Sequence, residues 1–266
     1  MIDIVFEEYN SRAIALDNGK VIGECNYILE DNVWNIIHTG VGSEYQGQGI
    51  ARKLVECVIK NANDLNKKVI AECSYAKKVL NSDLKNIVKQ YLEIFPEEKE
   101  RQNMINDYLS STSDPFDWDD FNGHLVAGGI IYAEKEKKFL MLEHRDLDMF
   151  LHPGGHIDKT DKNVLFAAKR EIREETGLDN LNIVSLSENE LIPFDIDTHH
   201  VEINQRLNLP AHYHFEFRYL FKLKEIVDVN IDEDESRSFK WISLEELEKD
   251  GKYNVIVNKI KSLNIL

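Results

Sequence analysis

Residues 2–41 carry apolar side chains in the alternating and short-run patterns that are typical of β-strands. The apolar positions and runs are Ile2, Ile4, Phe6, 12–16, 21–29 and 34–41. Between two of these runs, the sequence Asp17-Asn18-Gly19-Lys20 favours a hairpin turn, because Asn and Gly tolerate the positive φ that such turns need. We therefore predict that this segment forms successive strands of one sheet.

After Gln46-Gly47-Gln48-Gly49 the apolar period changes to that of an amphipathic helix. Its apolar stripe consists of Ile50, Leu54, Val55, Val58, Ile59 and Ala62. Glycines let a ligand approach the backbone closely, and the first turn of a helix presents unpaired N–H donors. A glycine-rich turn before a helix is therefore typical of phosphate binding. A tight turn without a ligand explains the same residues, and the local sequence leaves both interpretations open.

Further helices and a second group of strands are predicted beyond residue 68. Residues 69–71 form a short strand pattern, a helix begins at 75–80, and residues 84–109 form a helix interrupted near Pro96. Strand patterns follow at 125–133 and 139–144. The apolar stripe of the second helix is Leu84, Ile87, Val88, Tyr91 and Leu92. We predict that this stripe packs against the C-terminal part of the chain, which places one domain at residues 1–84 and a second at residues 85–266.

The chain has 266 residues, of which 42% are apolar, and this suffices for two modest domains. Its net charge of −16 disfavours binding to nucleic acid phosphates through bulk electrostatics. The acidity is uneven, since residues 1–84 hold 12 acidic and 9 basic side chains and the remainder hold 36 and 23. This difference indicates two domains with different chemistry, the second suited to cations or to ligands that bring a metal ion.

Cysteine usage and the N-terminal sequence predict a cytoplasmic protein. The three cysteines, Cys25, Cys57 and Cys73, form neither a disulfide framework nor a zinc ribbon by number and spacing. The N-terminal residues carry early acids and no long apolar run, unlike a signal peptide. No segment approaches the ~20 apolar residues of a membrane span. We therefore expect no membrane partner and leave the oligomeric state open.

The most informative segment of the chain is a predicted helix with three glutamates on one face. Glu171, Glu174 and Glu175 have the spacing i, i+3, i+4, and like charges so placed destabilise a helix. A divalent cation among the carboxylates removes the repulsion, and hard oxygen ligands suit Mg²⁺ or Mn²⁺. A solvated acidic helix is the alternative, but it leaves the preceding glycine pair and Arg170 unexplained. Gly177 is predicted to cap the end of the helix.

Residues 170–178 match R-E-U-x-E-E-x-G-U, the second half of the Nudix box, at every specified position. The chain from about residue 85 to its end therefore resembles a Nudix hydrolase, which implies an α/β/α sandwich with a mixed sheet. The first half of the box departs from the pattern. Gly155 is followed by five residues and Asp161, and eight residues then precede Arg170. This departure puts the role of Asp161 in doubt and leaves the metal-binding helix untouched.

The resemblance implies that water attacks the pyrophosphate of a nucleoside diphosphate linked to another group, with Mg²⁺ or Mn²⁺ as cofactor. The residues that it assigns to catalysis are Glu171, Glu174, Glu175, Arg170 and Glu235. The first three are the implied metal ligands, and Arg170 braces them or touches phosphate. For the further carboxylate we favour Glu235 over Glu202 and Glu216, with a solvated acidic loop as the alternative. ADP-ribose, dinucleotides, CoA derivatives and oxidised nucleotides remain as possible substrates.

The N-terminal part of the chain resembles a second family. Gln46, Gly49 and Ala51 match Gln-x-x-Gly-x-Ala, the acetyl-CoA pyrophosphate loop of GCN5-related N-acetyltransferases (GNAT), and residues 1–84 resemble the short single-domain members. The resemblance implies that backbone amides hold the pyrophosphate and that the strand ending at Val41 pairs with the pantetheine arm. The implied acetyl-CoA-binding residues are Val41, Gln46, Gly47, Gln48, Gly49, Ile50, Ala51 and Cys73.

Three side chains of this module have a chemical and a structural interpretation. Cys73 is either a polar or nucleophilic group beside the acetyl carbon or a small buried residue at a strand end. His38 is either a general base or a structural strand residue. Tyr75 either protonates the leaving thiolate or packs in the core.

Histidines are concentrated in the second domain, where two of them alternate on a predicted strand. His212 and His214 share one face of that strand, and His199 and His200 precede them. Histidines spaced in this way can bind zinc, but we favour a place in the substrate pocket, where they hydrogen-bond phosphate or ribose. The predicted substrate-binding residues are Gly155, His156, His212 and His214.

Together these patterns predict a two-domain α/β protein, with a short GNAT-like module followed by a Nudix hydrolase. Its expected ligands are acetyl-CoA and a nucleotide-type small molecule. Two alternatives belong to other functional classes. One is a Nudix fold that senses a nucleotide without cutting it, which the intact acid cluster argues against. The other is an acetyltransferase whose Nudix half only recognises the acceptor.

Overall fold

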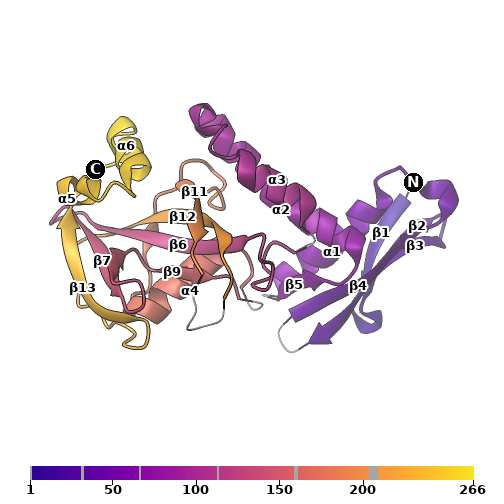
Figure 1. The fold of residues 1–266 in the computed structure, drawn as a ribbon. Coiled ribbons are helices and arrows are strands. Elements are labelled where there is room, and N and C mark those ends of the chain that lie inside the picture. The colour runs from indigo at the N-terminus through magenta and orange to yellow at the C-terminus, as the bar shows by residue number, and fades with distance from the viewer. Residues whose placement is uncertain (1, 31–32, 66, 113, 159–160, 204–208) are drawn as a thin grey trace. The chain divides into compact units, whose positions relative to one another are not determined.

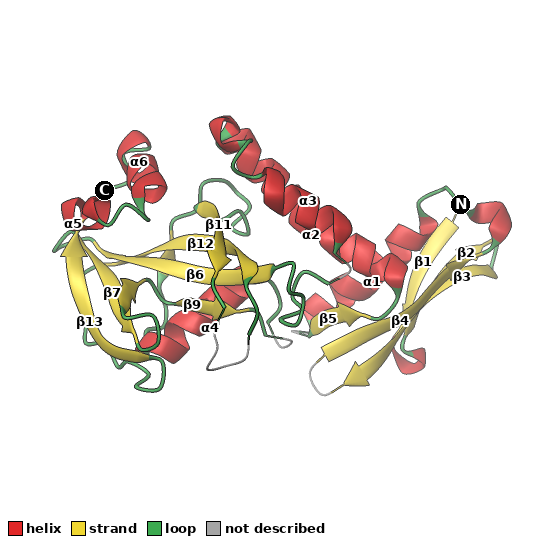
Figure 2. Cartoon of the chain, viewed as in Figure 1, coloured by secondary structure: helices red, strands yellow, loops and turns green. Residues whose placement is uncertain are grey.

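Two β-sheets, each accompanied by helices, organise the chain (Figure 2). The structure is a computed structural model that describes residues 2–30, 33–65, 67–112, 114–158, 161–203 and 209–266. Its contacts divide the chain into two units. The first comprises residues 1–86, 109–115 and 158–162, and the second comprises residues 87–108, 116–157 and 163–266.

The first unit contains a sheet whose described strands follow the chain in the order β1-β2-β3-β4-β5. They are β1 (Ile2–Glu7), β2 (Arg12–Asp17), β3 (Lys20–Glu30), β4 (Val33–Val41) and β5 (Lys68–Ala71). Neighbours are antiparallel except β4 and β5, which run parallel. Asn18 and Gly19 adopt φ values of 49° and 78° in the β2–β3 turn, which confirms the predicted hairpin. Short 3-10 helices occupy Glu8–Asn10 (η1) and Ser43–Tyr45 (η2).

Helix α1 (Ile50–Asp64) packs on this sheet through the stripe predicted from the sequence. The buried members of the stripe are Ile50, Leu54, Val55, Val58 and Ala62. They share one core with Ala13, Ala15 and Ile36 from the strands. Figure 1 shows α1 lying along the sheet of the first unit. This core fixes the position of the glycine-rich turn that precedes α1.

Helix α2 (Ser74–Ile94) is continuous, so the helices predicted at 75–80 and from 84 onward are one. The interruption predicted near Pro96 is confirmed, since η3 (Pro96–Glu98) and α3 (Asn103–Ser111) follow. The domain boundary predicted after residue 84 falls inside α2, and the two units divide within the same helix. That boundary stays a prediction. None of the helices formed by the described residues has the length and apolar character needed to cross a membrane.

The second unit is built on a mixed sheet with the path β10-β12-β6-β7-β13. Its described strands are β6 (His124–Ala133), β7 (Lys138–His144), β8 (Met149–Leu151), β9 (Gly154–His156), β10 (Asn182–Ile183), β11 (Asp195–Val201), β12 (His212–Leu223) and β13 (Ser236–Ser243). Strands β12 and β6 run parallel, and β9 and β11 add antiparallel pairs to β6 and β12. The mixed sheet agrees with the sequence prediction.

Helices cover both faces of this sheet, as Figure 1 shows for α4 and α6. They are α4 (Val164–Thr176), α5 (Leu244–Lys249) and α6 (Asn254–Ser262). On one face, Gly129 of β6 lies so close to α4 that a Cβ there would overlap the Ile172 side chain. On the other face, α6 joins a core that includes Ile130 and Leu220. The layers therefore form an α/β/α sandwich.

A buried ionic cluster ties the helices of the second unit to its sheet. Asp195 of β11 is fully buried and accepts hydrogen bonds from Lys259 Nζ and Arg101 Nη1, each at 2.8 Å. The hydroxyl of Tyr91 lies 3.4 Å from the same carboxylate. Burial raises the pKa of Asp195, but Lys259 and Arg101 outweigh it and hold that pKa well below its ordinary value. The C-terminal half of α2 thus docks on the second unit, as predicted for Tyr91.

We expect Asp195→Asn to lower the free energy of unfolding by up to about 3–5 kcal/mol, because it removes the fully buried carboxylate of the cluster and leaves the buried ammonium of Lys259 with the carboxylate of Glu98 alone. Urea denaturation of the full chain measures this change. Asp148→Asn is the matched control, since the ion pair of Asp148 with Arg237 is exposed and exposed pairs contribute about 0–1 kcal/mol. Equal stability of the two variants would contradict the role given to Asp195.

Candidate active site

The acidic helix α4 is delimited by local sequence signals and packs against strand β9. Asn163 caps its start, accepting a hydrogen bond from the Phe166 amide at 2.9 Å. Gly177 ends it in the left-handed conformation, with φ 69°, which confirms the predicted cap. Before α4, the Asp161 carboxylate accepts a hydrogen bond from the Asp158 amide at 2.7 Å.

Two glycines of β9 bring the backbone against the glutamates of α4. The Gly154 amide donates to Glu175 Oε1 at 2.6 Å. At Gly155, a Cβ would lie only 2.8 Å from both carboxylate oxygens of Glu171. Glycine is therefore required at 155 for Glu171 to approach the strand as it does.

Arg170 braces two of the three glutamates and the strand. Its Nη1 lies 3.0 Å from Glu171 Oε1 and 2.6 Å from Glu174 Oε2. Its Nη2 donates to the carbonyl oxygen of His156 at 2.8 Å. Of the two roles considered for Arg170, the geometry supports bracing of the carboxylates.

The three glutamates of α4 carry more negative charge than Arg170 can neutralise. Glu171 and Glu175 are buried, whereas Glu174 is half exposed. Burial raises the pKa of Glu171 to about 7, even with Arg170 beside it. Burial also raises the pKa of Glu175 to about 9, and repulsion from Glu235 and Glu171 adds to the effect. Buried carboxylate oxygens that repel one another in this way fit a divalent cation.

The three further carboxylates considered for catalysis lie in different surroundings. Glu235 interacts electrostatically with Glu171, Glu174 and Glu175, and its pKa is raised by burial and by Asp232. Glu216 is instead buried on the opposite sheet face, bonded to His152 at 2.7 Å. The exposed Glu202 contacts His200 at 3.2 Å. The structure thus brings Glu235 to the acidic cluster and places the other two elsewhere.

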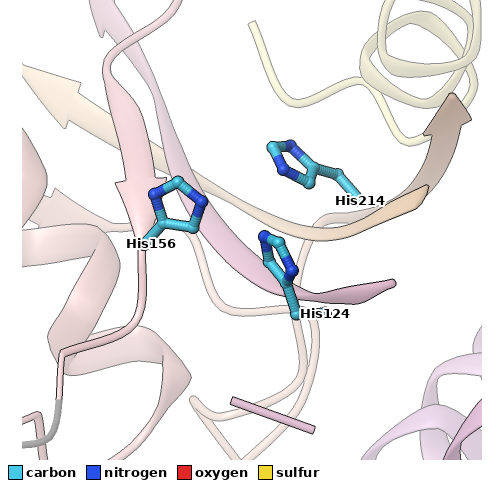
Figure 3. Close-up of side chains that lie close together, drawn as sticks. All are labelled: His124, His156 and His214. Atoms are coloured by element: carbon cyan, nitrogen blue, oxygen red, sulfur yellow. The ribbon is translucent and has the colours of Figure 1, made fainter. Parts of the chain in front are cut away.

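Histidines gather on the sheet face opposite α4. Residues 124, 126 and 128 of β6 share a face, and Gly128 lies under the side chains of His152 and Glu216. His214 pairs with His124, and His156 lies opposite Val126, so all three side chains are on this face (Figure 3). Burial lowers the pKa of His124 to about 4 and that of His214 to about 2.

Of the four residues predicted to bind substrate, only Gly155 lies directly beside the glutamates. The histidine side chains at 156, 212 and 214 are on the other face, and the His156 ring stacks near Trp118 with a centroid separation of 4.6 Å. Sequence reasoning missed His124, the first residue of β6. Its one signal is its position at the start of an apolar strand, where a histidine is unusual.

In the first unit, the glycine-rich turn from Gln46 to Ala51 leads into α1. Gly49 occupies the N-cap with φ 74°, and no side chain caps the helix there. A Cβ at Gly47 or Gly49 would meet nothing within 4 Å, so the space beside both is open. Strand β5 pairs with β4 only as far as Ile36, which leaves one edge of residues 37–41 without a described strand. These features offer backbone donors near the end of β4.

The side chains with open roles in this unit differ in exposure. Cys73 precedes α2; burial raises its pKa, but hydrogen bonds from the Ala76 amide and from Thr39 outweigh it and leave that pKa below its ordinary value. Cys25, by contrast, is buried with a pKa raised to about 11. Tyr75 is 39% exposed, which excludes core packing as its role. His38 is exposed as well.

Comparison with protein families gives a match in each unit. Residues 12–86 match the family model described as GCN5-related N-acetyl-transferase. Residues 123–260, more than half of the chain, match the model described as NUDIX domain. A search of curated proteins gave no match.

Solved structures similar to the chain are Nudix hydrolases of low identity. An Ap4A hydrolase of C. elegans in a binary complex is 21% identical with a TM-score of 0.36, covering 53% of this chain and 96% of that one. The E. coli dihydroneopterin triphosphate pyrophosphohydrolase is 21% identical with a TM-score of 0.35, covering 46% and 82%. A NUDIX family hydrolase of Clostridium perfringens is 20% identical with a TM-score of 0.40, covering 53% and 97%.

The raised pKa values of Glu171 and Glu175 predict how stability depends on pH without metal. The folded protein keeps protons on both groups where the unfolded chain, with a pKa of 4.5, has released them. In EDTA, the free energy of unfolding should therefore fall as pH rises from 4.5 toward about 9, by up to ~1.4 kcal/mol per pH unit for each proton.

Glu175→Gln removes one of these titrating groups and should flatten the pH dependence. Chemical denaturation at several pH values in EDTA measures it for each variant. Glu188→Gln, at an exposed glutamate, is the control and should follow the unmodified protein. An unchanged slope in Glu175→Gln would show that this carboxylate does not retain its proton.

Proposed function

The chain belongs to the NUDIX family, and on that basis we propose that its second unit hydrolyses the pyrophosphate bond of a nucleoside diphosphate linked to another group. The observation that carries the proposal is the buried acidic cluster of α4, held by Arg170 and by the glycines of β9. Its donors are carboxylate oxygens whose charge Arg170 compensates only in part, and such donors fit Mg²⁺ or Mn²⁺.

In this proposal the chain's own residues have separate tasks. Glu171, Glu174 and Glu175 would hold the cation, which when bound would supply polarisation of the phosphoryl oxygens and activation of water. Arg170 keeps two of the carboxylates in place. Glu235 takes the proton of the attacking water, because a carboxylate with a raised pKa near the cluster is suited to general base catalysis.

A sensor that binds a nucleotide without cutting it is the alternative for this unit. The acidic cluster argues against a sensor, because Glu171 and Glu175 are both buried and ionising them there costs free energy, as their raised pKa values indicate. A binding protein has no need for carboxylates that destabilise its fold in this way.

For the first unit, whose domain is GNAT-like, we propose acetyl-CoA binding. The open space beside Gly47 and Gly49 and the uncapped start of α1 suit a pyrophosphate held by backbone amides. The free edge at residues 37–41, ending at Val41, suits the amide groups of a pantetheine arm. The lowered pKa of Cys73 suits a polar group beside the thioester. Acetyl transfer itself and its acceptor are not part of this proposal.

We expect Glu174→Gln to reduce Mg²⁺-dependent turnover by about 10²-fold or more, because it removes a ligand oxygen charge. A panel of nucleoside diphosphate compounds, followed by release of monophosphate, measures it, and EDTA should abolish the activity. Glu235→Gln should lower kcat as well, whereas Glu202→Gln, at an exposed glutamate away from the cluster, is the matched control. Full turnover in Glu174→Gln would exclude this mechanism.

We expect Gly49→Glu to abolish acetyl-CoA binding to the full chain, because the side chain would bring bulk and negative charge to the pyrophosphate position. Isothermal calorimetry measures the binding. Gly251→Glu is the matched control, since Gly251 has a similar φ of 78° and equally open surroundings but belongs to the second unit. If the unmodified protein binds no acetyl-CoA at millimolar concentration, or Gly49→Glu binds normally, the loop is an ordinary turn.

A further inference from the structure

We propose that His124, His156 and His214 form a zinc site on the sheet face opposite α4 (Figure 3). The site is distinct from the acidic cluster in both its position and its ligands. It goes beyond the proposed hydrolysis and does not depend on it.

Strand register brings the three side chains together from distant parts of the sequence. His124 and His214 are partners in the parallel pair of β6 and β12. His156 of β9 lies opposite Val126, one pleat along the same face. Each histidine offers one nitrogen, and these nitrogens lie within 4.8 Å of one another. In a tetrahedral zinc site, ligand nitrogens are roughly 3.3 Å apart, so small side-chain rotations close the site.

His124 supplies an independent sign that a ligand belongs here. Its side chain is 2% exposed, and neither ring nitrogen has a hydrogen-bond partner of good geometry among the described residues. The backbone of Asp120 interacts with the ring, but this does not offset the effect of burial on its pKa. A buried polar side chain without a partner costs free energy. A metal ion would satisfy the nitrogen that carries the lone pair, at a place from which water is largely excluded.

His212 holds the ring of His214 in a defined orientation. Its Nδ1 donates to the carbonyl oxygen of Pro210 at 2.8 Å, since that oxygen can only accept. If the His212 ring is neutral, its Nε2 carries no proton and can only accept. The contact of 3.1 Å between this atom and Nε2 of His214 is then a hydrogen bond in which His214 Nε2 is the donor. His214 is left with its lone pair on Nδ1. Metal-binding histidines are typically held in this way by a hydrogen bond from the second ring nitrogen.

The donor set favours zinc over the cations expected at α4. Imidazole nitrogen suits Zn²⁺ and its neighbours among the transition metals, whereas Mg²⁺ and Mn²⁺ prefer carboxylate oxygen. Asp197, His199 and Glu216 form a second cluster on the same face. There, however, the guanidinium of Arg218 already lies 2.9 Å from Asp197 and 2.8 Å from Glu216. The three-histidine cluster is therefore the stronger site.

The position of His156 suggests what the ion does. Strand β9 contacts the glutamates of α4 through Gly154 and Gly155, and the His156 carbonyl accepts from Arg170. An ion bound to His156, His124 and His214 would link β9 to β6 and β12. We assign it a structural role, in which it fixes the strand that carries the glycine pair.

Titration of the full chain with Co²⁺, a coloured substitute for Zn²⁺, tests the site in the presence of excess Mg²⁺. We expect one equivalent to bind with the intense visible bands of tetrahedral Co²⁺ and to be displaced by Zn²⁺. His156→Ala, at a half-buried position, should weaken binding by more than the ~10–100-fold that loss of an outer hydrogen-bond partner causes. His200→Ala is the matched control, because its side chain lies on the other face of β11 and is exposed.

Further variants test the role of His212 and the independence of the two metal sites. His212→Ala should weaken binding ~10–100-fold with the bands unmoved, and His212→Gln, which retains an acceptor, should restore it. Glu174→Gln should keep the bands, because the cation site of α4 shares no ligand with the three histidines. The proposal is overturned if no saturable Co²⁺ binding occurs, if His156→Ala binds as His200→Ala does, or if Glu174→Gln loses the bands.

Discussion

The close approach of α4 to strand β9 is the constraint on which the chemistry of the second unit depends. Gly155 permits it, because a side chain at 155 would collide with the Glu171 carboxylate, whereas Gly154 allows β9 to lie against the backbone of β6. The approach buries two carboxylates beside a third and raises the pKa of Glu171 to about 7 and of Glu175 to about 9. The repulsion is the reason that we propose a divalent cation at this place, since a cation would relieve it.

The same sheet separates two kinds of polar chemistry by its two faces. The face toward α4 carries carboxylates near the glycine pair, and the opposite face carries imidazoles and the ionic cluster around Asp195. Because side chains alternate along a strand, Gly155 and His156 of β9 face opposite ways although they are neighbours in sequence. Arg170 joins α4 to β9, because its guanidinium contacts the Glu171 carboxylate and donates to the carbonyl oxygen of His156. The proposed zinc site and cation site therefore share a strand but no ligand.

Sequence patterns predicted what is locally encoded and missed what depends on long-range contact. The periods of α1 and α4, the Asn18-Gly19 turn and the Gly177 cap are local, and the structure confirms them. The continuity of α2 was missed, because the buried side chains of Val79, which packs in the core of the first unit, and Leu84 override the weak helix propensity around residues 81–83. His124 was missed because only the parallel pairing of β6 with β12, about 90 residues apart in sequence, places it beside His214.

Both proposed ligands contain a pyrophosphate, and the two units approach it by opposite electrostatic means. In the first unit the loop offers neutral backbone N–H groups at an uncapped helix start, so the anion is met directly by donors. In the second unit the site is itself anionic, so a pyrophosphate can approach only after a cation has reversed the local charge. A chelator should therefore remove the cation proposed for the second unit without affecting a pyrophosphate held, as proposed, by the backbone N–H groups of the first.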